Sequence, residues 1–206
     1  MEDVRKSMER HGIPGRDLYD LPTSEKRFPD GCHYRIEISG VERPSTLEAL
    51  IDEMEKRNVP VHRLISMVMG STLLSDDELE NFAKMARDAK LEVIVTPGPR
   101  AGWDLGGQIR TPEGAISGMR FRGSDNLAHV IADIKRTVEF GFRGFLVVDE
   151  GLLWLLNQMR KVGDIPKDVV FKVSIFAGHA NPAGAKVLEM LGANTFNPVA
   201  DLTVPM

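Results

Sequence analysis

Short apolar runs alternate with amphipathic stretches along most of the chain. The runs predict strands, and the stretches with apolar residues three and four positions apart predict helices. The expected strands cover 34–39, 63–69, 91–96, 144–149, 169–176 and 194–198. Helices are expected over 2–11, 44–57, 76–90, 125–140, 152–161 and 182–191. Because each pair of neighbouring parallel strands needs a crossover, this order predicts a parallel α/β sheet.

Several expected helices begin with capping signals. Ser45 with Glu48, and Ser75 with Glu78, have the spacing of capping boxes, in which serine and glutamate satisfy the first free amides of a helix. Ser124 is expected to cap the helix that follows it. These signals fix where three of the helices should start.

Two architectures fit a parallel sheet of this kind: a doubly wound open sheet and a (β/α) barrel of the TIM type. A barrel places polar side chains on the inward faces of its strands. Alternating residues of three strands do so here, namely Arg35, Glu37 and Ser39, then Lys172 and Ser174, then Thr195 and Asn197. The pattern favours the barrel over the open sheet.

The expected barrel is incomplete. A complete barrel has eight strand–helix units, and only six are found before the last residue, Met206. We therefore expect residues 1–32 to form an N-terminal helix and a wrapping segment, and residues 33–206 to form a barrel domain that is truncated at its C-terminus. The open strand edges of such a domain favour a homo-oligomer.

Composition excludes several classes of partner. The 206 residues carry a net charge of −4, with 42% hydrophobic and 27% charged residues, which gives no basic surface for nucleic acid or anionic lipid. No apolar run reaches membrane-spanning length, and the charged N-terminus does not resemble a signal peptide. Cys32 is the single cysteine and cannot form an internal disulfide. The expected location is the cytoplasm, without nucleic-acid or membrane partners.

Candidate catalytic residues are those that close strands, because barrel active sites lie at the carboxyl ends of the strands. Glu37, Asp149 and His179 come from three different strands and could perform acid–base chemistry. The same three side chains are candidate ligands for a divalent metal cofactor. The structural alternatives are that His179 shapes its own turn, and that Asp149 and Glu150 are helix N-terminal charges.

A long segment from 97 to 123 follows the third expected strand and contains several arginines. Arginine binds carboxylates and phosphates through its planar fork, which predicts an anionic substrate held by Arg100, Arg110 or Arg120. The alternative is that these arginines pair with acidic residues of the same segment. Further candidate substrate-binding residues at strand ends are Thr96, Asn181 and Asn197.

Lys172 lies in the middle of an expected strand, on the same face as Ser174. A buried amine with a lowered pKa could form a Schiff base with a carbonyl substrate. An unpaired buried charge is costly, however, so we favour an ion pair with Glu37 or Glu92 near the floor of the barrel.

Two segments, residues 44–50 and 184–193, resemble the collagenase-like family U peptidases in their sequence and in their order relative to the strands, and the resemblance covers much of 33–200. It implies a barrel with peptidase activity. The cysteine-rich signature of that family is not present in this chain, so no catalytic residue is transferred from it.

These observations lead to three functional hypotheses. The first is a barrel enzyme that hydrolyses a small anionic or peptide-like substrate. The second is a lyase or aldolase-type barrel enzyme that acts on a carboxylate or phosphate. The third is a barrel that binds a ligand without catalysis and uses the same loops.

Overall fold

The computed structural model describes residues 1–206 except 22, 69, 99–111 and 113–119. Its strands are β1 (Glu37–Val41), β2 (Arg63–Ser66), β3 (Glu92–Val95), β4 (Gly144–Val147), β5 (Val170–Val173) and β6 (Thr195–Phe196). Its helices are α1 (Glu2–Arg10), α2 (Pro44–Arg57), α3 (Asp76–Asp88), α6 (Gly123–Glu139), α7 (Glu150–Val162) and α8 (Pro182–Leu191), with short 3₁₀ turns η1 (Ser71–Leu73) and η3 (Ile175–Ala177). The predicted alternation of strands and helices is confirmed.

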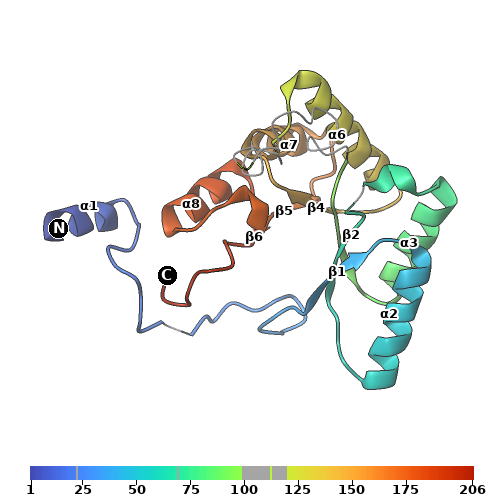
Figure 1. The fold of residues 1–206 in the computed structure, drawn as a ribbon, viewed down its shortest axis with the longest axis horizontal. Coiled ribbons are helices and arrows are strands. Elements are labelled where there is room, and N and C mark those ends of the chain that lie inside the picture. Colours follow the sequence, from blue (N-terminus) through green and yellow to red (C-terminus); the bar gives the residue numbers. More distant parts are fainter. Residues whose placement is uncertain (22, 69, 99–111, 113–119) are drawn as a thin grey trace.

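The six strands form one parallel sheet in the order β1-β2-β3-β4-β5-β6. The sheet curls, and the helices that connect the strands lie around its outer side (Figure 1). Sequential strand order without a reversal distinguishes a barrel from a doubly wound sheet. The fold is therefore an incomplete α/β barrel, as the inward polar pattern predicted.

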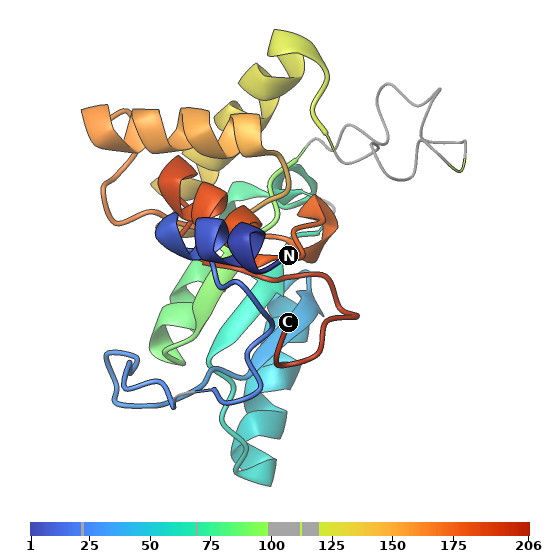
Figure 2. The ribbon, with the colours of Figure 1, turned by 90° about the vertical axis from the view of Figure 1, so that its left-hand side faces the viewer.

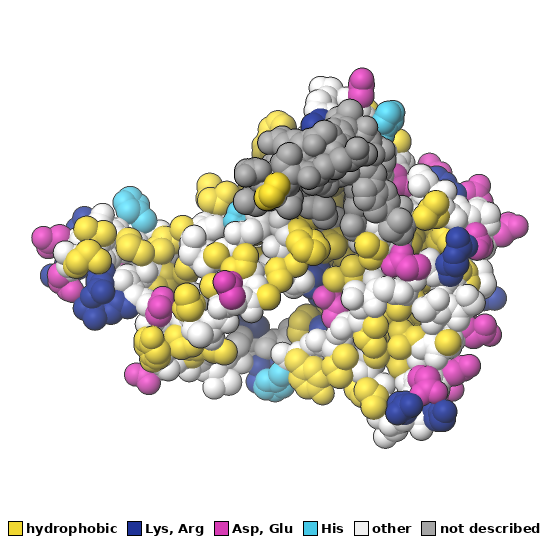
Figure 3. Space-filling view, viewed as in Figure 1, with side chains coloured by type: hydrophobic (Ala, Val, Ile, Leu, Met, Phe, Trp, Pro, Cys, Tyr) yellow, Lys and Arg dark blue, Asp and Glu magenta, His cyan; other side chains and the backbone are white. Residues whose placement is uncertain are grey.

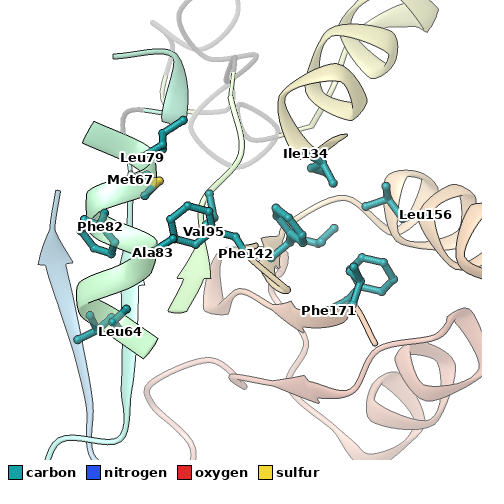
Figure 4. Packing of buried hydrophobic residues seen from close by; sticks show 14 of the residues in the cluster. Leu64, Met67, Leu79, Phe82, Ala83, Val95, Ile134, Phe142, Leu156 and Phe171 are labelled. Atoms are coloured by element: carbon teal, nitrogen blue, oxygen red, sulfur yellow. The ribbon is translucent and has the colours of Figure 1, made fainter. Parts of the chain in front are cut away.

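The main hydrophobic core lies between the outer face of the sheet and the helices. Figure 4 shows Leu64, Val95 and Phe171 from the strands pointing toward the helical layer. Phe82 of α3 and Leu156 of α7 are fully buried against them. Since alternate strand residues face this core, the residues between them must face the inside of the curled sheet.

One of the three predicted helix caps is confirmed. Ser75 accepts a hydrogen bond from the Glu78 amide at 3.2 Å, and the Glu78 carboxylate accepts from the Ser75 amide at 2.9 Å. The prediction for Ser45 was wrong, because Pro44 already occupies the first turn and Arg43 is the N-cap. The prediction for Ser124 was also wrong, since α6 begins two residues earlier than expected, at Gly123, and Arg122 is its N-cap.

The N-terminal segment crosses the side on which the sheet is open. It runs from α1, near α8, along the bottom of the view to β1 (Figure 1), and Figure 2 shows it beside the C-terminal residues. The Leu18 amide donates to the Pro205 carbonyl at 2.9 Å. The segment thus spans the distance between the two edge strands, β1 and β6.

The surface mixes charges of both signs. Figure 3 shows acidic and basic side chains interspersed over α1 and over the side formed by α2 and α3. On the face that this view shows, the mixture of signs agrees with the small net charge of the chain. In the described part of the chain, no helix has the length and apolarity needed to cross a membrane.

Candidate active site at the carboxyl ends of the strands

Charged side chains line the inside of the sheet where the strands begin. The register places Glu37, Arg63 and Glu92 side by side at the first positions of β1, β2 and β3. Lys172 reaches Glu37 across the interior, with Nζ 2.8 Å from Oε2, and Arg63 Nε lies 2.8 Å from Glu92 Oε2. The predicted ion pair of Lys172 is confirmed, and its amine is occupied by a carboxylate.

A cavity of about 430 Å³ opens at this same end of the strands. It is lined by Arg63, Glu92, Arg143, Asp168 and Lys172, among others. These charges already neutralise one another, because Arg143 pairs with Asp168 as Arg63 does with Glu92. The larger cavity therefore lies at the floor of the barrel, among side chains that form ion pairs with one another. Active sites of barrels lie at the opposite end, where the strands finish.

The second cavity, of about 310 Å³, lies at the carboxyl ends of the strands, and we call it the mouth pocket. Most of its wall is apolar, with Phe121 and Phe176 among the lining residues. Four neutral polar side chains from four different strand ends interrupt this wall: Ser39, Thr96, Ser174 and Asn197. A wall of this kind fits a small ligand with a few hydrogen-bonding groups.

Thr96 lines the mouth pocket, and in the described part of the chain its hydroxyl group lacks the hydrogen bond that a buried polar group normally makes. Its side chain is buried, and its Oγ1 has no hydrogen-bond partner among the described residues. Ser174 differs, because its Oγ accepts the Phe176 amide at 3.3 Å. A buried hydroxyl without a partner is costly unless another polar atom satisfies it.

Hydrogen bonds link three titratable side chains at the rim of the mouth pocket: Arg120, Glu150 and His179. His179 Nε2 lies 2.9 Å from Glu150 Oε1, and Arg120 contacts both oxygens of the same carboxylate, with Nη2 3.1 Å from Oε1. Arg120 also donates to the carbonyl of Val148 at 2.8 Å, and Val148 lines the pocket. The structure thus joins two predicted site residues, Arg120 and His179, through Glu150.

The carboxyl group of Glu150 is ionised at neutral pH. Burial by itself disfavours its charge, but hydrogen bonds from Arg120, its own backbone amide and His179 outweigh burial, and the pKa of Glu150 is lowered. An ionised carboxylate accepts a hydrogen bond from Nε2–H, which in a neutral imidazole leaves Nδ1 without a proton. Glu150 therefore favours the tautomer of His179 that is protonated at Nε2.

Gly184 of α8 lies next to that nitrogen. A Cβ at this position would be 2.9 Å from His179 Nδ1, closer than side chains normally approach. The absence of a Cβ therefore lets the His179 ring lie against the first turn of α8, with Nδ1 on the side of the helix.

The Asp149 carboxylate accepts hydrogen bonds from two backbone amides. Its Oδ1 accepts the Leu152 amide at 2.9 Å as the N-cap of α7, and its Oδ2 accepts the Phe121 amide at 3.3 Å. These bonds hold the end of β4 and the residues before α6 together. The helix-terminal interpretation of Asp149 is confirmed, and Glu150, predicted mainly as a second such charge, is the residue that contacts His179.

The predicted metal set of Glu37, Asp149 and His179 is not brought together. Of the described His, Cys, Asp and Glu residues, only Asp30, Cys32 and His62 form a group of three with ligand atoms within 4.8 Å of one another. Glu37 opens β1 instead of closing it, since the strand begins three residues later than expected. It therefore faces the floor of the barrel, at the opposite end from the mouth.

The other predicted substrate-binding residues do not all line the mouth pocket. Asn181 is the N-cap of α8 and accepts the Gly184 amide at 2.9 Å, whereas Asn197 and Thr96 line the mouth pocket. Arg100 and Arg110 lie outside the described residues. Two aromatic residues of the pocket wall were not among the predicted site residues: Phe121, two residues before α6, and Phe176, in η3 after β5.

Comparison with known proteins gives little further information. No family model and no curated protein matches the chain. A sugar phosphate isomerase/epimerase from Parabacteroides distasonis aligns with 68% of this chain and 54% of its own length, at 16% identity and a TM-score of 0.32. A dihydropteroate synthase from Xanthomonas albilineans, in complex with 7,8-dihydropteroate, aligns with 83% of this chain and 89% of its own, at 14% identity and a TM-score of 0.25.

This chain thus spans about half the length of the first of these structures. Similarity at this level carries no argument about activity, and the fold assignment rests on the strand order itself. The resemblance to collagenase-like peptidases finds no support in the comparisons, because no family model matches.

Proposed function

We propose that this chain carries the active-site face of a barrel enzyme of the lyase or isomerase type, which acts on a small carboxylate or phosphate compound. The observation that carries the proposal is the contact of 2.9 Å between His179 Nε2 and Glu150 Oε1 at the rim of the mouth pocket. A carboxylate that fixes the tautomer of a histidine is a common arrangement for general acid–base catalysis.

In this proposal the imidazole of His179 removes and returns a proton on the substrate. Glu150 stabilises the imidazolium that forms, because its carboxylate is ionised and lies against Nε2. Thr96 supplies a hydroxyl to a carbonyl or hydroxyl oxygen of the substrate in the mouth pocket. Proton transfer next to a carbonyl is the step shared by many isomerases and lyases.

Arg120 would hold the anionic group of the substrate. A guanidinium has five N–H donors, and Val148 and Glu150 engage three of them. The other two make no hydrogen bond with the described residues, and in this proposal they bind one carboxylate or phosphate oxygen.

The size of the mouth pocket favours a small molecule over a peptide. Its volume of about 310 Å³ is at the lower end of the range for small-molecule sites. Cys32, the one thiol, precedes β1 and so lies at the opposite end of the strands from the pocket. These features support the lyase or isomerase hypothesis over the peptidase hypothesis.

The test is a screen of small carboxylates and sugar phosphates by thermal shift, followed by NMR detection of turnover for each compound that binds. His179→Gln should lower turnover by about 100-fold or more while binding is retained. His129→Gln is the matched control, because His129 is exposed on α6.

Equal turnover in wild type and His179→Gln would remove His179 from the mechanism. Binding without any turnover would favour the non-catalytic ligand-binding barrel.

A further inference from the structure

A second cluster of reactive side chains lies at the opposite end of the sheet from the mouth pocket. Asp30 and Cys32 belong to the segment that leads into β1, and His62 directly precedes β2. One candidate ligand atom from each residue lies within 4.8 Å of the other two. The acid–base mechanism proposed above uses none of them.

A closed turn holds Asp30 and Cys32 together. The Gly31 amide donates to the Phe28 carbonyl at 2.8 Å, and the Phe28 amide donates to the Cys32 carbonyl at 3.0 Å. The Cys32 amide donates to Asp30 Oδ1 at 3.1 Å. Gly31 has a φ of 83°, which glycine adopts without steric cost. The carboxylate and the thiol are therefore close before any ion binds.

His62 is fixed from the other side of the cluster. Its amide donates to the Ile36 carbonyl at 3.0 Å, and its ring packs edge-on against Tyr34, with centroids 5.9 Å apart. Its Nδ1 accepts the Ile36 amide at 3.1 Å, so this nitrogen is unprotonated, as metal binding requires. Binding of an ion by this ring replaces that hydrogen bond with a coordinate bond.

The charges around the cluster can balance a divalent cation. The Asp30 carboxylate lies 2.9 Å from the Arg35 guanidinium, with which it forms an ion pair. Arg35 has two further neighbours, Glu92 Oε1 at 3.5 Å and the ring of Phe28 at 4.0 Å. Arg35 can stay on these neighbours when Asp30 turns to an ion, and the negative charges of Asp30 and a Cys32 thiolate then offset the two charges of the ion.

We propose that Asp30, Cys32 and His62 bind one Zn²⁺ ion. Thiolate and imidazole ligands select zinc over magnesium or calcium, which prefer oxygen ligands. The ion displaces the proton of the Cys32 thiol, which is released to solvent, and a water completes the four-coordinate site. The site would fasten the segment before β1 to the start of β2, next to the open edge of the barrel.

The test uses the full chain, treated with a chelator and kept reduced, and then titrated with Co²⁺ and Zn²⁺. We expect one equivalent of Co²⁺ to produce the near-ultraviolet absorption of a cobalt–thiolate bond, and Zn²⁺ to displace it. Zn²⁺ should also raise the melting temperature of the wild type. A titration without cobalt–thiolate absorption would overturn the proposal.

Single substitutions of the three proposed ligands test where the ion binds. Cys32→Ser should abolish the cobalt–thiolate absorption, and His62→Gln and Asp30→Asn should weaken Zn²⁺ affinity by about 100-fold or more. His33→Gln, an exposed neighbour, is the matched control and should bind like the wild type. The circular dichroism and melting temperature of each metal-free variant are first compared with those of the wild type. Cobalt–thiolate absorption and Zn²⁺ affinity are then compared among the variants that fold like the wild type.

His179→Gln separates this site from the mouth pocket, and it should leave Zn²⁺ affinity unchanged. Loss of the ion in His179→Gln, or its retention in Cys32→Ser, would place the ion elsewhere and overturn the proposal.

Discussion

Lys172 on β5 and Glu37 on β1 are 135 residues apart, and their side chains form an ion pair across the inside of the curled sheet, with Nζ 2.8 Å from Oε2. Lys172 is almost fully buried, and Glu37 is mostly buried. The pair joins a central strand to an edge strand that has no neighbour on its other side.

Removal of one partner should leave a poorly solvated charge. Lys172→Met should lower the free energy of unfolding by about 3 kcal/mol, and the double variant Glu37→Gln with Lys172→Met by less than the sum of the two single changes. Urea unfolding of the four proteins measures this coupling. Lys135→Met, at an exposed position on α6, should change little. Strict additivity of the two single effects would contradict an energetic role for the pair.

Glu150 gives a prediction about pH. Its pKa in the folded protein is lowered from the ordinary glutamate value of 4.5, so its ionised form stabilises the fold above that value. The contribution is lost as the pH falls below 4.5 and through the lowered pKa. Glu150→Gln should therefore cost about 0.5–1 kcal/mol at pH 7, after allowance for partial solvent exposure, and less at pH 3.

Chemical unfolding of the wild type and Glu150→Gln across this pH range measures the effect. Glu139→Gln is the matched control at an exposed position, and its difference from wild type should stay near zero. A cost of Glu150→Gln that is the same at pH 3 and pH 7 would show that the charge of Glu150 contributes nothing.

Gly184→Ala tests the position of the His179 ring. Alanine usually stabilises a helix relative to glycine by about 1 kcal/mol, but here its Cβ would be 2.9 Å from His179 Nδ1. We expect the ring to shift away from Glu150 and the gain in helix stability to be reduced. NMR of the imidazole resonances reports the shift directly. Gly151→Ala, in α7, does not touch His179 and is the control; identical imidazole spectra for both variants would exclude a spacing role for Gly184.

The sequence predicted most of the fold because its signals are local. Apolar runs gave six strands at nearly the observed positions, and Ser75 with Glu78 formed the expected capping box. The errors at Ser45 and Ser124 are shifts of the N-cap by two residues, which a local pattern does not resolve. The inward polar faces followed from the same periodicity, and the strand order then showed that the sheet is a barrel and not doubly wound.

The candidate site was predicted in part. Position after a strand identified Thr96, His179 and Asn197, which the structure places in or near the mouth pocket. The same rule failed for Glu37, because the start of β1 decides whether this residue faces the floor or the mouth. The sequence named Asp149 as the carboxylate after β4 that acts with His179, whereas in the structure the neighbouring Glu150 contacts the imidazole.

The sequence by itself therefore determined the order of the elements and the inward face of each strand, since both depend on the spacing of residues within one segment. Only the tertiary structure decided which side chains meet. Glu150 contacts His179 because the ends of β4 and β5 are adjacent, and Asp30 with Cys32 approaches His62 because β1 and β2 pair. Contacts between distant segments depend on the register and curl of the whole sheet, and no local pattern of residues encodes them.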